Sequence, residues 1–242
     1  MLRAVWRLAR VLAHVTQGVW LVSMHFKHRT ELQRQALVVS WSRRLLALFA
    51  IELEVRGQPA VDGPMLLLAN HISWIDITVV HATRYCRFVS KGEVRHWPLI
   101  GTLAHGIGTL FIERESRRDA MRVVHHMAQS LRAGDVLAVF PEGTTSDGVG
   151  LLPFHANLLQ AAISARAQIQ PVAIQYLDRA TGRASREPAY IGDDHLIGSI
   201  WRVLRASDLR VVVSFAEPQG DAGRDRRQWA ADAREVIARM RE

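Results

Sequence analysis

The fold of this chain is decided by the stretch Met65-Leu66-Leu67-Leu68-Ala69-Asn70-His71-Ile72-Ser73-Trp74-Ile75-Asp76. It opens with an apolar run behind the turn signal Asp62-Gly63-Pro64, which predicts a buried strand. The residues that follow predict a loop and then a helix. The loop at the end of a buried strand is where a rigid scaffold presents catalytic groups, so His71 and Asp76 are candidate site residues.

The spacing of His71 and Asp76 restricts how the two side chains can meet. Five steps of a regular helix would leave them roughly 140° apart. They meet only if His71 precedes the helix and Asp76 lies in its first turn. There the carboxylate can hold one ring nitrogen and leave the other free as a base. Pairs with this spacing also arise by chance as a capping residue and a surface histidine, so a second site has to decide between the two interpretations.

The rest of the chain alternates between apolar runs of strand length and longer amphipathic stretches. This alternation predicts an α/β fold with a largely parallel central sheet flanked by helices. The predicted strands are 51–55, 65–69, 87–90, 109–112, 136–140, 169–175 and 211–215. The predicted helices are 74–83, 117–131, 156–165 and 225–240. Residues 178–186 are predicted to form a loop.

Residues 1–50 differ in character from the rest and predict two amphipathic helices. Residues 11–26 carry no formal charge, and this run of 16 residues is shorter than the roughly 20 that cross a bilayer core. Tryptophans and arginine edges favour a two-helix membrane-associating motif that lies on or dips into a bilayer as a peripheral or monotopic anchor. The alternative is a helical hairpin packed on the remainder of the protein.

The composition limits the classes of partner. The 242 residues carry a formal net charge of +8, which indicates either nucleic acid or an anionic membrane surface. The sequence has no zinc-finger spacing, no basic region followed by heptads and no aromatic-studded RNA-binding pattern, so nucleic acid is not expected. The single cysteine, Cys86, cannot form an intramolecular disulfide, which fits a reducing, cytosol-facing location, and the apolar run after it predicts a buried thiol.

Three further blocks decide how the first is interpreted. They are Gly108-Thr109-Leu110-Phe111-Ile112-Glu113-Arg114, Phe140-Pro141-Glu142-Gly143-Thr144-Thr145-Ser146 and Ile169-Gln170-Pro171-Val172-Ala173-Ile174. Together with residues 70–76, and in this order, they resemble the glycerolipid acyltransferase family, which includes lysophosphatidate acyltransferases. The resemblance covers residues 65–175 and implies an acyltransferase domain over 51–242 behind the N-terminal hairpin of 1–50.

The resemblance implies that a fatty acyl group moves from a thioester donor, acyl-CoA or acyl carrier protein, to the free hydroxyl of a lyso-lipid. His71 is then the general base, and Asp76 orients the ring and stabilises the imidazolium. Neither a cofactor nor an enzyme nucleophile is required, because the thioester is already activated. Ser73 is therefore expected to cap the helix rather than to attack. A lipid acceptor implies a place on the cytoplasmic face of the cell inner membrane.

The expected substrate-binding residues come from the other blocks. The third block resembles the part of the family that binds the acceptor, which points to Glu142, Gly143, Thr144 and Thr145. Because a carboxylate repels a phosphate, Glu142 is expected to fix its loop or to bind a hydroxyl. Arg114 resembles the family's phosphate-facing arginine, and Lys91 is a second expected phosphate contact. The alternative for Arg114 is a solvated surface arginine.

Departures from the family's pattern concern the acceptor. The family commonly has arginine where this chain has Thr145 and lysine where it has His155. The expected acceptor is 1-acyl-sn-glycerol-3-phosphate, which gives phosphatidic acid, and the alternative is lyso-ornithine lipid, which lacks a phosphomonoester. A serine hydrolase using Ser73 or Ser146 is less favoured, because no Gly-x-Ser-x-Gly elbow is present. A non-enzymatic basic binding protein would leave the Phe-Pro-Glu-Gly block unexplained.

Overall fold

The structure is a computed structural model that describes residues 1–112 and 117–242, and this part of the chain contains a seven-stranded sheet. The strands are β1 (Ile51–Arg56), β2 (Met65–Ala69), β3 (Arg87–Lys91), β4 (Leu110–Ile112), β5 (Val136–Val139), β6 (Gln168–Asp178) and β7 (Leu209–Phe215). Their order across the sheet is β1-β7-β6-β2-β5-β3-β4, and each neighbouring pair is parallel except β6 with β7. The predicted fold class is confirmed.

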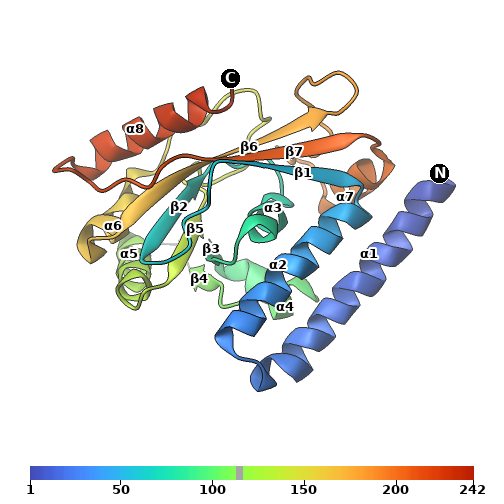
Figure 1. Cartoon of the computed structure of the whole chain (residues 1–242), viewed down its shortest axis with the longest axis horizontal. Helices are drawn as coiled ribbons and strands as arrows, with labels where there is room; N and C mark the ends of the chain where they lie inside the picture. The colour runs from blue at the N-terminus through green and yellow to red at the C-terminus, as the bar shows by residue number, and fades with distance from the viewer. Residues whose placement is uncertain (113–116) are drawn as a thin grey trace.

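Helices cover both faces of the sheet (Figure 1). They are α3 (Asp76–Thr83), α4 (Ile100–Gly106), α5 (Arg117–Arg132), α6 (Leu159–Ala165), α7 (Leu196–Arg205) and α8 (Arg226–Arg239), with 3₁₀ turns at Gly92–His96 and Ala156–Leu158. The sequence predicts α3, α5, α6 and α8, whereas α4 and α7 are additional. The predicted loop over 178–186 follows the end of β6.

The central strand β2 is buried along its whole length. Successive side chains of a strand point to opposite faces. Leu66 and Leu68 accordingly join the core cluster that includes residues of α5 and α8, whereas Leu67 and Ala69 join the cluster that includes residues of α3. Because both faces are covered, the strand is apolar throughout instead of alternating.

The N-terminal hairpin packs against the rest of the protein. Helix α1 (Leu2–Trp20) continues through a π-helical turn (Leu21–His25) and a 3₁₀ turn (Phe26–His28), and α2 (Glu31–Leu48) returns beside it. A Cβ atom on Gly18 would lie 2.7 Å from the Trp41 indole nitrogen, so glycine permits the two helices to approach closely. Arg43 donates to the Ala82 carbonyl at 2.8 Å and ties α2 to α3. Within the described residues, none of the helices combines the length and apolar character that spanning a bilayer requires.

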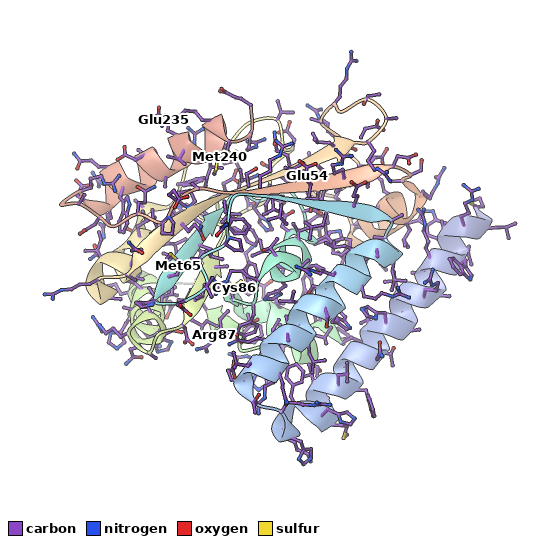
Figure 2. The ribbon with its side chains drawn as sticks, viewed as in Figure 1. Glu54, Met65, Cys86, Arg87, Glu235 and Met240 are labelled. Carbon is purple, nitrogen blue, oxygen red and sulfur yellow. The ribbon has the colours of Figure 1, made fainter. Side chains whose placement is uncertain are left out.

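The parallel strands give the sheet two different edges. Met65 and Arg87 begin β2 and β3 and lie at the amino-terminal edge, close to Cys86 (Figure 2). The same strands end at the opposite edge, which receives the loop of His71 and the side chain of Lys91. The candidate site is therefore at the carboxyl-terminal edge of the sheet, where ligands of open α/β sheets usually bind.

Candidate active site

His71 lies in the loop between β2 and α3, and the end of β2 is held firmly. The Asn70 side chain donates to the Ile174 carbonyl at 3.0 Å and accepts from the Ile174 N–H at 2.7 Å. These two bonds continue the ladder between β2 and β6 beyond the last strand residue. His71 follows directly, and its Nδ1 lies 2.9 Å from Oδ2 of Asp76, the first residue of α3. The geometry required by the five-residue spacing is thus confirmed.

The Asp76 carboxylate is fully buried and accepts four hydrogen bonds. Oδ2 accepts from His71 Nδ1 at 2.9 Å, from the Ile72 N–H at 2.6 Å and from the Ser73 N–H at 2.8 Å. Oδ1 accepts from the Tyr176 hydroxyl at 2.7 Å. A carboxylate surrounded by donors is stabilised in its ionised form and has only acceptor capacity.

This arrangement assigns the ring proton. Because the ionised Asp76 only accepts, the proton of neutral His71 lies on Nδ1, and Nε2 is left with a lone pair. The imidazole also stacks on the Phe140 ring with a centroid distance of 3.9 Å and an interplanar angle of 6°. Its side chain is 18% exposed, enough for a substrate hydroxyl to reach it. His71 therefore has the orientation and the access that a general base needs.

Ser73 lies three residues ahead of α3, and its Oγ accepts from the Ile75 N–H at 3.5 Å, so it bonds the turn that leads into the helix rather than the helix itself. The residue directly before the helix is Ile75, which has no capping side chain, and the Asp76 carboxylate accepts from the N–H groups of Ile72 and Ser73. Ser73 is fully buried. Ser146 is also buried, and its hydroxyl donates to the His71 carbonyl at 3.1 Å. Neither serine is presented as a nucleophile, which argues against a serine hydrolase.

Glu142 fixes the loop that faces His71, which is one of the two roles expected for it. Its Oε1 accepts from the His71 N–H at 2.7 Å, and its Oε2 accepts from the Leu152 N–H at 2.8 Å. Burial raises the pKa of the Glu142 carboxyl, and this effect is opposed by the two N–H donors and by the charges of His71 and Arg241. The carboxylate thus joins the loop after β2 to the loop after β5.

The turn after Glu142 depends on glycine. Gly143 has φ of +72° and donates its N–H to the Phe140 carbonyl at 3.1 Å. A residue with a Cβ atom is strained in this left-handed region. Thr144 next to it is exposed and presents the block's accessible hydroxyl. The Thr145 hydroxyl, expected to bind the acceptor, donates to the Tyr190 carbonyl in this structure.

The structure describes one of the two residues expected to contact a phosphate, which is Lys91. Lys91 ends β3 and is exposed at the same edge of the sheet as His71. Arg114 falls within residues 113–116 and lies outside the described residues. His155 donates its backbone N–H to the Pro141 carbonyl at 2.7 Å and exposes its side chain.

Sequence reasoning missed four contributors to the site. Tyr176 lies one residue beyond the predicted end of its strand and gave no local signal. Asn70 directly precedes His71 in the sequence, but its pairing with β6 depends on the strand order. Arg234 and Arg241 were missed as well. Arg234 donates to the Leu152 carbonyl at 3.0 Å, and Arg241 donates to the Gly148 carbonyl. These two arginines therefore hold the loop that reaches Glu142.

Comparison with known proteins agrees with this geometry. The family model described as Acyltransferase matches residues 52–175. The chain belongs to the acyltransferase family. This confirms the family resemblance and makes the protein an acyltransferase that carries the His71–Asp76 pair within the matched region.

Several named proteins are similar to this acyltransferase. A lyso-ornithine lipid O-acyltransferase of Pseudomonas aeruginosa is 39% identical over 243 residues, which is 98% of this chain and 92% of that protein. A 1-acyl-sn-glycerol-3-phosphate acyltransferase of Neisseria meningitidis serogroup B is 39% identical over 184 residues, covering 75% of this chain and 71% of that protein. The crystal structure of PlsC, the 1-acyl-sn-glycerophosphate (LPA) acyltransferase of Thermotoga maritima, has a TM-score of 0.64 at 18% identity, with 97% of each chain covered, and supports the fold.

Proposed function

We propose that this acyltransferase transfers a fatty acyl group from a thioester to the free hydroxyl of a lyso-lipid, with His71 as general base. The observation that carries the proposal is the bond from His71 Nδ1 to the buried Asp76, which leaves Nε2 free beside the Glu142 loop. The names of the relatives support a lyso-lipid as the acceptor.

The reaction proceeds by direct attack. Nε2 of His71 accepts the hydroxyl proton while the acceptor oxygen forms a bond to the thioester carbon. The carbon–sulfur bond breaks, and the imidazolium returns the proton to the thiolate. Asp76 stabilises the imidazolium between these two steps. The buried positions of Ser73 and Ser146 support a mechanism without an acyl-enzyme.

Two acceptors are candidates. Lysophosphatidate is supported by the exposed cation of Lys91 at the edge of the site and by the relative from Neisseria meningitidis. Lyso-ornithine lipid is favoured by Thr145 and His155, which replace cations that would bind a phosphomonoester. It is also favoured by the relative from Pseudomonas aeruginosa, which matches nearly the whole chain.

The acceptor and donor are tested together. Purified protein is given labelled acyl-CoA or labelled acyl carrier protein, with lysophosphatidate and lyso-ornithine lipid as separate acceptors, and the labelled product is identified. A product from either acceptor supports lyso-lipid acylation and names the acceptor. If every combination stays at the level of a no-enzyme blank while the protein is folded and membrane-bound, the proposal is overturned.

The N-terminal hairpin is proposed to hold the enzyme on the cytoplasmic face of the inner membrane as a peripheral or monotopic anchor. Helix α1 and the turn after it expose large apolar side chains, with relative exposures of 88% for Leu2, 61% for Trp6, 53% for Leu12 and 54% for both Trp20 and Met24. The Arg10 guanidinium lies 4.2 Å from the centre of the Trp6 ring. Apolar side chains beside cations are typical of helices that lie in an anionic membrane surface.

Vesicle binding tests this anchor. The double variant Trp6→Ser, Trp20→Ser is expected to lose most of its cosedimentation with vesicles that contain anionic lipid. The matched control is Met121→Ser on α5, which is 73% exposed but lies across the molecule from α1 (Figure 1). Equal loss in both variants, or no loss in the double variant, would contradict the assignment.

A further inference from the structure

Strand β6 is longer than its parallel neighbour β2 and extends past the end of β2 at the edge of the sheet where the site lies. The last paired residue of β2, Ala69, lies opposite Val172, whereas β6 continues to Asp178. The overhang remains paired on its other side, because β6 runs antiparallel to β7 as far as Asp178. It therefore forms a paired part of the sheet that extends past the carboxyl end of β2.

The two-residue period of β6 decides which side chain reaches α3. Val172, Ile174 and Tyr176 all belong to the core cluster that includes residues of α3. Tyr176 is the member of this row furthest beyond β2. Its side chain thus approaches the first turn of α3 from the sheet and bonds the carboxylate oxygen of Asp76 that His71 does not use.

The Tyr176 hydroxyl is the single side-chain donor that Oδ1 of Asp76 has among the described residues, at 2.7 Å. The other carboxylate oxygen takes His71 and two backbone N–H groups. Tyr176 is 2% exposed. Burial, followed by the neighbouring carboxylate of Asp76, raises the pKa of Tyr176 well above its usual value, so the phenol remains a donor throughout the working pH range.

We propose that Tyr176 is a positioning residue, which acts on the base through Asp76. This inference rests on the proposed role of His71. A hydrogen bond at Oδ1 stops the carboxylate from rotating away from Nδ1, and no other side chain in the described part of the chain does this. The donor also withdraws negative charge from the carboxylate and so weakens its hold on the imidazolium. His71 is thereby kept oriented toward the acceptor side of the site.

The other ionisable groups at the site do not substitute for this contact. Glu142, from the loop after β5, bonds the backbone N–H of His71 rather than its ring. Arg241, beyond α8, acts on Glu142 through its charge. On α3 itself, Asp76 is the group that bonds the ring. A change at Tyr176 therefore reaches the base only through the carboxylate.

The test compares Tyr176→Phe with Tyr85→Phe. Tyr85 supplies a matched control, because its partly buried hydroxyl also donates one hydrogen bond, to the Ile107 carbonyl at 2.9 Å, near the opposite edge of the sheet. Tyr176→Phe is expected to lower kcat about tenfold to a hundredfold with little change in KM, since a buried carboxylate oxygen is left without a donor. Tyr85→Phe is expected to keep the wild-type kcat.

The pH profile separates positioning from simple loss of stability. Without the phenol, more negative charge remains on Asp76 and the protonated ring is favoured. The acid limb of the kcat/KM profile of Tyr176→Phe should therefore move to higher pH by about half a unit. In an Asp76→Asn background, Tyr176→Phe should add less than about a twofold further loss, because both changes act through the same carboxylate.

Two results would overturn the inference. One is a lower melting temperature for Tyr176→Phe with unchanged kcat per folded molecule and an unchanged pH profile, which would make the contact purely structural. The other is full additivity with Asp76→Asn. Failure of the proposed function has a different signature, because His71→Ala would then retain turnover whatever the behaviour of Tyr176→Phe.

Discussion

Helix α3 has one histidine ahead of its first turn and another in its last turn, and each bonds a group five residues further along the chain. His71 Nδ1 lies 2.9 Å from the Asp76 carboxylate, and His81 Nε2 lies 2.9 Å from the Cys86 carbonyl. The two rings are linked through aromatic contacts. His71 stacks on Phe140, and His81 meets the edge of Phe88, which stacks on Phe140.

The chemistry of the two histidines differs although their spacing is the same. His81 is buried, and that burial lowers its pKa to about 4, with a smaller opposing effect from the Cys86 carbonyl. It therefore stays neutral and serves packing. His71 keeps 18% of its side chain exposed and has an ionised partner. The comparison shows that a partner five residues further along does not by itself make a histidine a general base. The charge of that partner and the access of the ring to substrate decide whether it can act as one.

The largest expected effect comes from removing that charge. Asp76→Asn should lower kcat/KM about 10³- to 10⁴-fold, because an amide can turn its N–H toward Nδ1 and reverse the tautomer of His71. The control is Cys86→Ala at the other end of α3, where the histidine bonds a backbone carbonyl that the substitution leaves in place. Initial rates of acyl transfer measure both variants. An Asp76→Asn enzyme with more than a tenth of wild-type kcat/KM would show that the partner's charge is not what separates the two histidines.

A smaller effect is expected from replacing Glu142, which lies in a loop that contacts His71. Glu142→Ala leaves the N–H groups of His71 and Leu152 without their acceptor, at a cost of about 1–3 kcal/mol in the free energy of unfolding. The misplaced loop should also lower kcat about tenfold to a hundredfold. Urea unfolding and initial rates check both effects. Unchanged kcat with reduced stability would mean that Glu142 supports the fold but not the base.

The one effect that leaves catalysis unchanged concerns the pH dependence of stability and belongs to His81. In the unfolded chain this histidine binds a proton near pH 6.5, whereas in the folded protein it does so near pH 4. The contribution of His81 to the free energy of unfolding is therefore fully present above pH 6.5. It is lost as the pH falls toward 4, by about 3 kcal/mol in total. Urea unfolding at several pH values should show this slope in wild type and a flatter one in His81→Gln. Equal slopes would contradict the neutral, structural role of His81.

The parts of the molecule that sequence predicts well are those governed by local pattern. The continuous apolar run of β2 and the spacing from His71 to Asp76 allow only one way for the pair to meet, and the structure has it. Helix α7 was detectable too, since Leu196, Ile200 and Val203 recur at helical spacing.

The contacts that sequence did not predict depend on residues far apart in the chain. Tyr176 reaches Asp76 because β6 overhangs β2, which follows from pairing with β7 and not from any local motif. The Thr145 hydroxyl is taken by the Tyr190 carbonyl, 45 positions away. The Ser73 hydroxyl accepts from the Ile75 N–H in the turn ahead of α3 rather than from an N–H group of the helix, because α3 begins only at Asp76.

The most direct measurement compares the two histidines themselves. Initial rates of acyl transfer are measured for wild type, His71→Ala and His81→Gln at neutral pH, with folding of each variant checked by circular dichroism. His71→Ala should lose at least about a thousandfold in kcat while remaining folded, and His81→Gln should retain wild-type kcat per folded molecule. Wild-type-like turnover by folded His71→Ala would contradict the assignment of the base.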